Sequence, residues 1–210
     1  MAEFSFDNLS LERAERLVAE GLSARVTSGE VLLLIGANGS GKSSLLRALA
    51  GLLPPAAGRI AWDGIDIAKS ADAHRARLKF LGHQDAVKPG LTTAENLAFW
   101  ASVGRGDARS ALGLFKLTSL ADRPARFLSA GQRRRLALSR LALRHKALWL
   151  LDEPTTALDS DSRAAFLGLL KQHLDRGGMA IIATHDELGV AERLTLQVPG
   201  RRDIAQGAAA

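Results

Sequence analysis

The segment from Gly36 to Ser43 constrains the fold more than any other part of the sequence. It reads GANGSGKS, which matches the pattern G-x-x-x-x-G-K-S, and it directly follows the apolar run VLLLI at Val31–Ile35. Glycines let the backbone curl so that successive N–H groups point toward one centre, and the N-terminus of a following helix adds partial positive charge. A loop of this kind between a buried strand and a helix predicts a phosphate-binding site.

The residues of this loop are expected to hold a nucleotide. Lys42 reaches the β- and γ-phosphates in this interpretation, and the Ser43 hydroxyl ligates Mg²⁺, so ATP and Mg²⁺ are the predicted cofactors. A glycine-rich turn with a chance lysine is the alternative, and the flanking strand and helix argue against it. The predicted nucleotide-binding residues of the loop are Gly36, Ala37, Asn38, Gly39, Ser40, Gly41, Lys42, Ser43 and Ser44.

A second apolar strand, predicted at Ala147–Leu151, ends in the acidic pair Asp152–Glu153. Its carboxyl end places these carboxylates at the sheet edge beside the phosphate loop. Asp152 is then expected to hold Mg²⁺ through water, and Glu153 to orient and deprotonate the attacking water. Taken alone, such a pair is more often a solvated strand end, and only its combination with the phosphate loop favours catalysis.

Strands and helices alternate along most of the chain, which predicts an α/β core with a mainly parallel sheet. The middle third is helical throughout and is interpreted as a subdomain of about residues 85–145 inserted into a single domain spanning 1–210. The other predicted strands are Glu3–Leu9, Leu22–Thr27, a hairpin turning at Asp63–Gly64, Leu78–Gly82 and Met179–Ala183. The predicted helices are Lys42–Leu53 (stopped by Pro54–Pro55), Thr93–Leu120, one after Gly131, Asp161–Leu174 and Asp186–Glu192.

Bulk composition narrows the classes of protein that need considering. The chain has 210 residues, 47% of them hydrophobic, so it is long enough for one domain with a sizeable core. It contains no cysteine, which excludes disulfides and thiolate metal sites. No signal peptide is recognised at the N-terminus, and no apolar run reaches transmembrane length. The net charge of +6 is compatible with a lipid surface or nucleic acid, but a solvated surface is the favoured interpretation.

Beyond the phosphate loop and the acidic pair, three further motifs and a glutamine position make the chain resemble the ATP-binding cassette (ABC) ATPases over nearly its whole length. LSAGQ at Leu128–Gln132 is similar to the family's signature motif, and TALD at Thr156–Asp159 to its D-loop. Gln84 falls at the Q-loop, and His185 in IIATHD at the switch histidine. The resemblance implies a P-loop NTPase fold with a RecA-like core, N-terminal antiparallel strands and an inserted α-helical subdomain.

The same resemblance implies a homodimer of cassettes that joins head to tail. In the family, each signature loop grips the nucleotide bound to the phosphate loop of the other subunit. Carried over, Ser129 and Gly131 donate to the γ-phosphate in trans with Gln132 beside them, and Asp159 reports across the dimer seam.

The resemblance also assigns the remaining catalytic roles. Glu153 is then the general base, and His185 stabilises the γ-phosphate or the attacking water. Gln84 touches Mg²⁺ or that water, and links the site to the helical subdomain.

Two positions depart from the family pattern. Ala130 stands where the commonest signature has glycine, and its small methyl group beside Gly131 is expected to preserve function. The family also places an aromatic residue under the adenine, near residue 13 here. The chain has no tyrosine, and Arg13 is the one candidate for stacking on the base through its guanidinium plane. Selectivity for adenine over guanine is left open by the sequence.

Within the family, the stretches LGHQDAVKPGLTTAENLAFW and LSAGQRRRLALSRL resemble the ATPase subunits of cytochrome c maturation (haem export) systems. That resemblance implies a peripheral protein on the cytoplasmic side of the inner membrane. The implied partners are a CcmB-like permease and CcmC- and CcmD-like proteins, and the work is release of the haem-loaded chaperone CcmE.

Alternatives remain at this stage. An ATPase for another ABC exporter is the closest one, and a cassette acting on nucleic acid or ribosomes is disfavoured because there is one motif set and no long heptad insertion. The run Arg133–Arg135 is interpreted as a solvated helix face rather than a grip on nucleic acid. No direct haem binding is expected, because His83 is interpreted as a strand-end residue that packs near the Q-loop.

Overall fold

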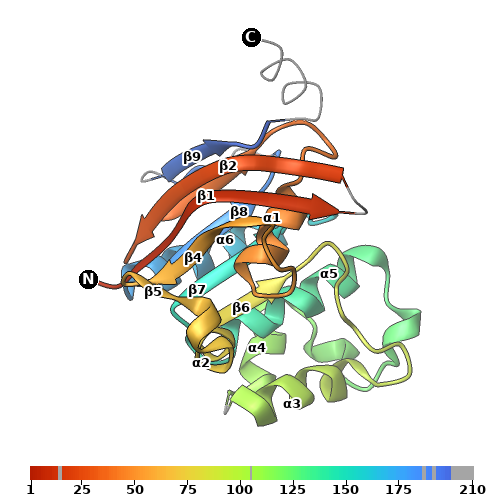
Figure 1. The fold of residues 1–210 in the computed structure, drawn as a ribbon. Coiled ribbons are helices and arrows are strands. Elements are labelled where there is room, and N and C mark those ends of the chain that lie inside the picture. The colour runs from red at the N-terminus through yellow and green to blue at the C-terminus, as the bar shows by residue number, and fades with distance from the viewer. Residues whose placement is uncertain (14–15, 105, 186–187, 191–192, 200–210) are drawn as a thin grey trace. The chain divides into compact units, whose positions relative to one another are not determined.

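A computed structural model shows two compact units, which we call the core unit and the helical unit (Figure 1). The core unit comprises residues 1–82, 146–153 and 174–210, and the helical unit comprises residues 83–145 and 154–173. The structure describes residues 1–13, 16–104, 106–185, 188–190 and 193–199.

An antiparallel sheet in the order β2-β1-β4-β5 forms one layer of the core unit. The strands are β1 (Glu3–Arg13), β2 (Arg16–Thr27), β4 (Ala57–Trp62) and β5 (Ile65–Asp66). Asp63 and Gly64 both have positive φ, 48° and 78°, as the two central residues of a type I′ hairpin turn require. The predicted hairpin and the first two predicted strands are confirmed, but β1 and β2 are longer than expected. The register between β1 and β2 is irregular beyond Phe6, so apolar and polar residues do not alternate strictly in the outer halves of these strands.

A parallel sheet in the order β6-β7-β8-β3-β9 carries the phosphate-loop strand between β8 and the edge strand β9. The strands are β3 (Val31–Ile35), β6 (Leu78–Leu81), β7 (Leu148–Asp152), β8 (Met179–Ala183) and β9 (Arg193–Gln197). Every residue of β7 and β8 is buried, which explains the uninterrupted apolar runs at Leu148–Leu151 and Met179–Ala183. The helix expected at 186–192 lies mostly outside the described residues, and 188–190 have no regular secondary structure.

Helix α1 (Lys42–Leu49) packs into the same core and ends earlier than predicted. Gly51, with φ of 69°, directly follows the C-cap Ala50. The Gly51 N–H donates to the Ala48 carbonyl at 2.9 Å, and the Leu52 N–H to the Arg47 carbonyl at 2.8 Å. This is a Schellman motif, so the glycine rather than the prolines beyond it stops the helix. A further helix, α2 (Ala71–Arg77), and the 3₁₀ turn Ile67–Lys69 were not predicted.

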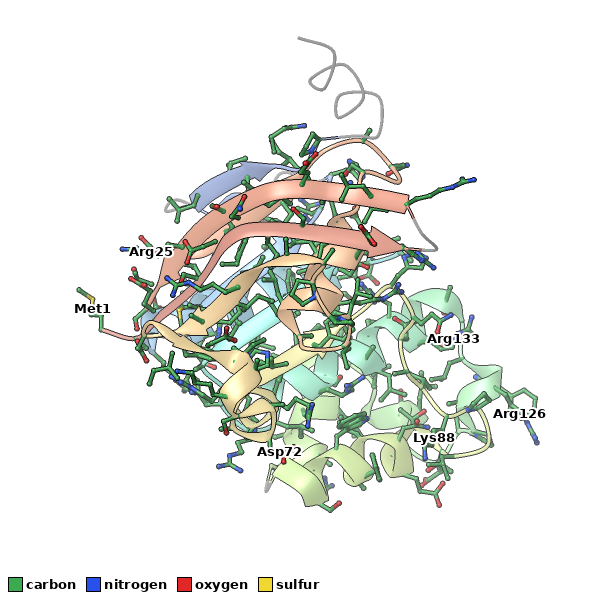
Figure 2. All side chains as sticks on the ribbon, in the orientation of Figure 1. Met1, Arg25, Asp72, Lys88, Arg126 and Arg133 are labelled. Atoms are coloured by element: carbon green, nitrogen blue, oxygen red, sulfur yellow. The ribbon has the colours of Figure 1, made fainter. Side chains whose placement is uncertain are left out.

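The helical unit contains two helices where one continuous helical stretch was expected. Asp107 caps α4 by accepting hydrogen bonds from the N–H groups of Arg109 and Ser110, and so separates it from α3. A backbone hydrogen bond joins the loop after Asp85 to the segment before α5, because the Arg126 N–H donates to the Pro89 carbonyl at 3.1 Å. The exposed side chains of Lys88 and Arg126 on these two segments are labelled in Figure 2. The helices are α3 (Thr93–Gly104), α4 (Ala108–Leu114), α5 (Ala130–Ser139) and α6 (Ser160–Asp175), with 3₁₀ turns at Thr118–Leu120, Ala125–Phe127 and Arg140–Ala142. Among the described residues, none of the helices has the length and apolarity to cross a membrane.

Candidate active site

The predicted phosphate loop has a backbone that only glycine fits. Gly36, Gly39 and Gly41 have φ of 146°, 80° and 104°. A Cβ on Gly36 would lie 2.4 Å from the Val198 carbonyl oxygen, and one on Gly41 would lie 3.0 Å from the Val18 carbonyl oxygen. All three glycines therefore supply a positive φ, and Gly36 and Gly41 also make room for the backbone of Val198 and Val18.

Polar groups around the loop suit an anion. Lys42 is buried, and its ammonium donates to the carbonyl oxygens of Gly36 at 2.7 Å and Ala37 at 3.0 Å, which holds a positive charge against the curled backbone. No side chain caps the N-terminus of α1 at Gly41. The buried Ser40 hydroxyl has no hydrogen-bond partner among the described residues. Uncapped N–H groups, a buried cation and an unsatisfied hydroxyl together fit a bound triphosphate.

Neighbouring strands of the parallel sheet bring the predicted acid and histidine together. Asp152 is buried at the end of β7, and the Glu153 N–H donates to the Ala183 carbonyl of β8 at 2.8 Å. His185 follows β8, and its Nε2 lies 3.5 Å from a Glu153 carboxylate oxygen. Glu153 has φ of 47°, a left-handed conformation that costs a residue with a side chain roughly 1–3 kcal/mol and is concentrated at functional sites. The geometry thus holds a carboxylate and an imidazole against each other beside a buried aspartate.

The predicted site residues of the helical unit are Gln84, Ser129, Gly131, Gln132 and Asp159. Gln84 is exposed in the segment after β6. His83 beside it is also exposed, so its expected packing is wrong. Arg13, the candidate for stacking on the base, is exposed at the end of β1 in the core unit.

The signature turn is a capping box at the start of α5. The Ser129 hydroxyl accepts the Gln132 N–H at 3.2 Å, and the Gln132 side-chain oxygen accepts the Ser129 N–H at 2.8 Å. A Cβ on Gly131 would lie 2.9 Å from the Ala157 carbonyl oxygen, so the signature turn and the D-loop are in contact within the helical unit. Gly131 is thus required by a close approach that the motif alone does not reveal.

Asp159 has a structural role in addition to the predicted one. Its carboxylate accepts the Ser162 N–H at 2.8 Å, and so caps α6. A hydrogen bond from the Ser162 side chain, and then this bond from the Ser162 backbone N–H, lower the pKa of the Asp159 carboxyl. The charged form is therefore the one that fixes the D-loop to its helix.

The arginine run after the signature is not a solvated face. Arg134 is buried, and its guanidinium pairs with Asp85 at 2.8 Å. Arg133 donates to the Leu128 carbonyl, and Arg135 to the Phe115 carbonyl at 3.3 Å. The interpretation fails for Arg134 because it lies one helical turn before Leu138, on the buried face of α5. That spacing was the signal available in the sequence.

The strand–loop–helix with Lys42, the buried Asp152 and the Glu153–His185 pair define a P-loop nucleotide-binding domain. The model of the ABC transporter family matches residues 19–156. The chain therefore belongs to the ABC transporter family of ATP-binding proteins.

Its relatives share most of its length. It is 48% identical to the cytochrome c biogenesis ATP-binding export protein CcmA of Paramagnetospirillum magneticum, over 89% of each chain. It is 49% identical to the CcmA protein of Rhodospirillum rubrum, over 89% of this chain and 82% of that one. Among solved structures, a dimeric ATP-binding cassette in a post-hydrolysis state, bound to ADP and phosphate, shares the fold with a TM-score of 0.78 at 24% identity, covering 95% of this chain and 97% of that one.

Proposed function

We propose that this chain is the ATP-hydrolysing subunit of a CcmA-type exporter of cytochrome c biogenesis. The observation that carries the proposal is the near-half identity to CcmA proteins over almost the whole chain. The pairing of Glu153 with His185 beside the phosphate loop supports a hydrolytic role for the same chain.

Different residues of the core unit have different roles in the reaction. The phosphate loop and Lys42 bind and orient the triphosphate, so that the γ-phosphorus faces Glu153. A water attacks that phosphorus while the Glu153 carboxylate accepts its proton, and the bond to the ADP oxygen breaks. His185, 3.5 Å from Glu153, orients the carboxylate or the water and stabilises charge on the γ-phosphate.

Ser43, Asp152 and Gln84 are the residues proposed to hold Mg²⁺. The described residues contain no group of three acidic, histidine or cysteine side chains able to bind a metal by themselves. A hydroxyl and a buried carboxylate fit a cation that takes its remaining ligands from phosphate and water. When bound, Mg²⁺ neutralises charge developing on the phosphates.

Two cassettes are proposed to share each nucleotide. The capping box leaves the Ser129 hydroxyl hydrogen available, because the oxygen accepts from Gln132 and a hydroxyl has one donor besides its lone pairs. Ser129 and Gly131 would present this hydrogen and the positive end of α5 to the γ-phosphate of the partner's site. Asp159 would report that contact across the seam.

A membrane permease of the CcmB type, with CcmC- and CcmD-like proteins, is the proposed partner at the cytoplasmic face of the inner membrane. The helical unit carries a small pocket lined by Ala86, Val87, Asn96, Leu97, Trp100, Leu136 and Arg140. Next to Trp100, the exposed Phe99 ring lies edge-on to the indole at 5.3 Å, and this apolar surface supports docking of a short helix.

Replacing Glu153 by glutamine tests the enzymatic proposal. Glu153→Gln should still bind ATP and should hydrolyse it ~10²–10⁴-fold more slowly, the usual loss when a general base is removed. Glu20→Gln, an exposed change on β2, is the matched control. Steady-state phosphate release by the purified chain decides, and near-normal turnover of Glu153→Gln would refute the assignment.

The physiological partner is tested with the same variant. Tagged Glu153→Gln should stay in the ATP-bound dimer, and it is purified from membranes in mild detergent with ATP. CcmB- and CcmC-like proteins should accompany it and be lost with Trp100→Ala. Co-purification of a different permease would support ATP hydrolysis for another ABC exporter and contradict the CcmA-type role. Co-purification of ribosomes or nucleic acid would contradict both exporter roles.

A further inference from the structure

The residue directly after Gln84 is anchored from two sides within the helical unit. The Asp85 carboxylate accepts a hydrogen bond from the Arg134 guanidinium at 2.8 Å, and the side chains are 23% and 6% exposed. The Asp85 backbone carbonyl accepts another from the Arg140 guanidinium at 3.5 Å. The Q-loop segment is therefore fixed at the residue next to its glutamine.

Both arginines belong to the helical segment that the signature opens. Arg134 lies on α5, whose first turn is fixed by the Ser129 capping box, and Arg140 follows in the next turn. At 1.5 Å per residue, the step from Ser129 to Arg134 spans about 7.5 Å of rigid helix. A shift of Asp85 therefore acts on the signature turn through one short, stiff element.

The arginines of this anchor are largely removed from water. Burial lowers the pKa of Arg140 to about 10, against the opposing effect of Asp85, so this guanidinium remains charged at neutral pH. Removing one member of a buried ion pair leaves the other charge uncompensated, which is far more costly than losing a surface pair. Arg140 also lies 3.8 Å over the ring of Trp100, so the anchor extends to the pocket wall.

We propose that Asp85 and Arg134 are positioning residues that join the Gln84 segment to the signature helix α5. Through this pair, a displacement of Gln84 at one nucleotide moves Ser129 and Gly131, which serve the other nucleotide of the dimer. The inference rests on the proposed function, since it gives these residues their nucleotide contacts.

The test uses Asp85→Asn, Arg134→Gln and their double variant in the full chain. Each single variant should lower kcat about tenfold, within the range of coupling energies seen for such links. ATP affinity of the monomer, measured with a fluorescent ATP analogue, should change less than about twofold because the phosphate loop belongs to the core unit. The double variant should fall no further than the worse single variant, because both changes remove one link.

Asp122→Asn and Arg123→Gln are the matched controls, since both residues are exposed in the same unit. Unchanged kcat in the single variants, or losses that multiply in the double variant, would overturn the proposal. Asp85→Glu keeps the charge and should recover most of the turnover, which separates positioning from misfolding. Glu153→Gln in the same assay separates the two ideas: if it hydrolyses ATP normally, the proposed function itself fails.

Discussion

Each unit of this protein buries apolar side chains, but the two units differ in how their loops are held. In the core unit, a continuous cluster of buried apolar side chains from both sheets and α1 includes Phe4, Leu45 and Ile181. In the helical unit, buried polar side chains fix the loops, with Asn96 and the Asp85–Arg134 pair as the main examples. Apolar burial is non-directional, whereas a hydrogen bond requires a particular partner and geometry. The phosphate loop thus rests on a close-packed apolar cluster, and the Q-loop segment beside the signature helix rests on directional polar contacts.

The comparison is sharpest where the core unit packs backbone against backbone. Gly58 on β4 has φ of 84°, and a Cβ there would lie 2.4 Å from the Asn8 carbonyl oxygen. Gly58→Ala should lower the free energy of unfolding by roughly 3–5 kcal/mol, through overpacking and left-handed strain together. Gly64 has a similar φ of 78° with no atom within 4 Å of the added Cβ, so Gly64→Ala should cost only about 1–2 kcal/mol. Urea denaturation measures both, and equal losses would show that close packing contributes nothing at β4.

In the helical unit the corresponding weak point is a polar side chain. The buried Asn96 accepts the Lys88 N–H at 2.8 Å and donates to the carbonyls of Lys88 at 3.0 Å and Thr92 at 3.0 Å. Asn96→Ala should destabilise the chain by roughly 2–3 kcal/mol, because it leaves buried backbone groups unsatisfied. Hydrogen exchange of the Lys88 amide should accelerate in parallel with the fall in the urea midpoint. Asn96→Asp keeps the acceptor and loses the donors, and a neutral effect of that change would show that the carbonyl contacts are unimportant.

How much could be predicted from the sequence follows the same division. The phosphate loop is a local motif, and uninterrupted apolar runs mark β3, β7 and β8, so the positions of these elements could be predicted from the sequence. Helix α2 could not be predicted, because its sequence ADAHRAR has no apolar stripe and the one residue it buries is His74. The contact between Asp85 and Arg134 joins residues 49 positions apart, and no local pattern announces such a pair.

Strand β9 and the Gly131 contact show the same limit at the site itself. β9 pairs with β3 along its whole length, yet its sequence RLTLQ is partly exposed and has no continuous apolar run. Gly131 was readable as a signature glycine, but not as the residue that makes room for the Ala157 carbonyl. The motifs identify the chemical groups of the site. The tertiary contacts that hold these groups in place involve residues far away in the sequence.

A polar link buried in the core unit, between Trp62, His74 and Leu49, gives a pH-dependent test of the comparison. Trp62 donates its indole N–H to His74 Nδ1 at 2.9 Å, and His74 Nε2 lies 3.0 Å from the Leu49 carbonyl, so the ring is held as the neutral tautomer. Burial lowers the pKa of His74, opposed by the Leu49 carbonyl, and the charges of Arg75 and Arg77 lower it further. The unfolded chain therefore binds the proton more readily than the folded one. Stability from this site is complete above the unfolded pKa near 6.5 and is lost as pH falls below it.

Thermal unfolding between pH 7.5 and 5 should reveal that loss. One proton changes the free energy of unfolding by at most about 1.4 kcal/mol per pH unit. His74→Gln keeps an amide able to accept from Trp62 and removes the titration, so its midpoint should depend less steeply on pH. Parallel curves for the two proteins would show that another group controls acid sensitivity.

The smallest expected loss of stability is at Ser129, the residue of the helical unit that is proposed to contact the nucleotide of the partner. Ser129→Ala removes the N-cap of α5 and should cost about 1 kcal/mol in unfolding free energy. Ser129→Asp restores a strong capping acceptor, so stability should recover. Turnover should not recover, because a carboxylate has no hydrogen to donate and repels the γ-phosphate. If Ser129→Asp hydrolyses ATP as well as the unmodified chain, Ser129 serves only as a helix cap; if it is stable and inactive, the hydroxyl hydrogen serves the nucleotide of the partner, and the polar construction of this unit is part of the catalytic cycle.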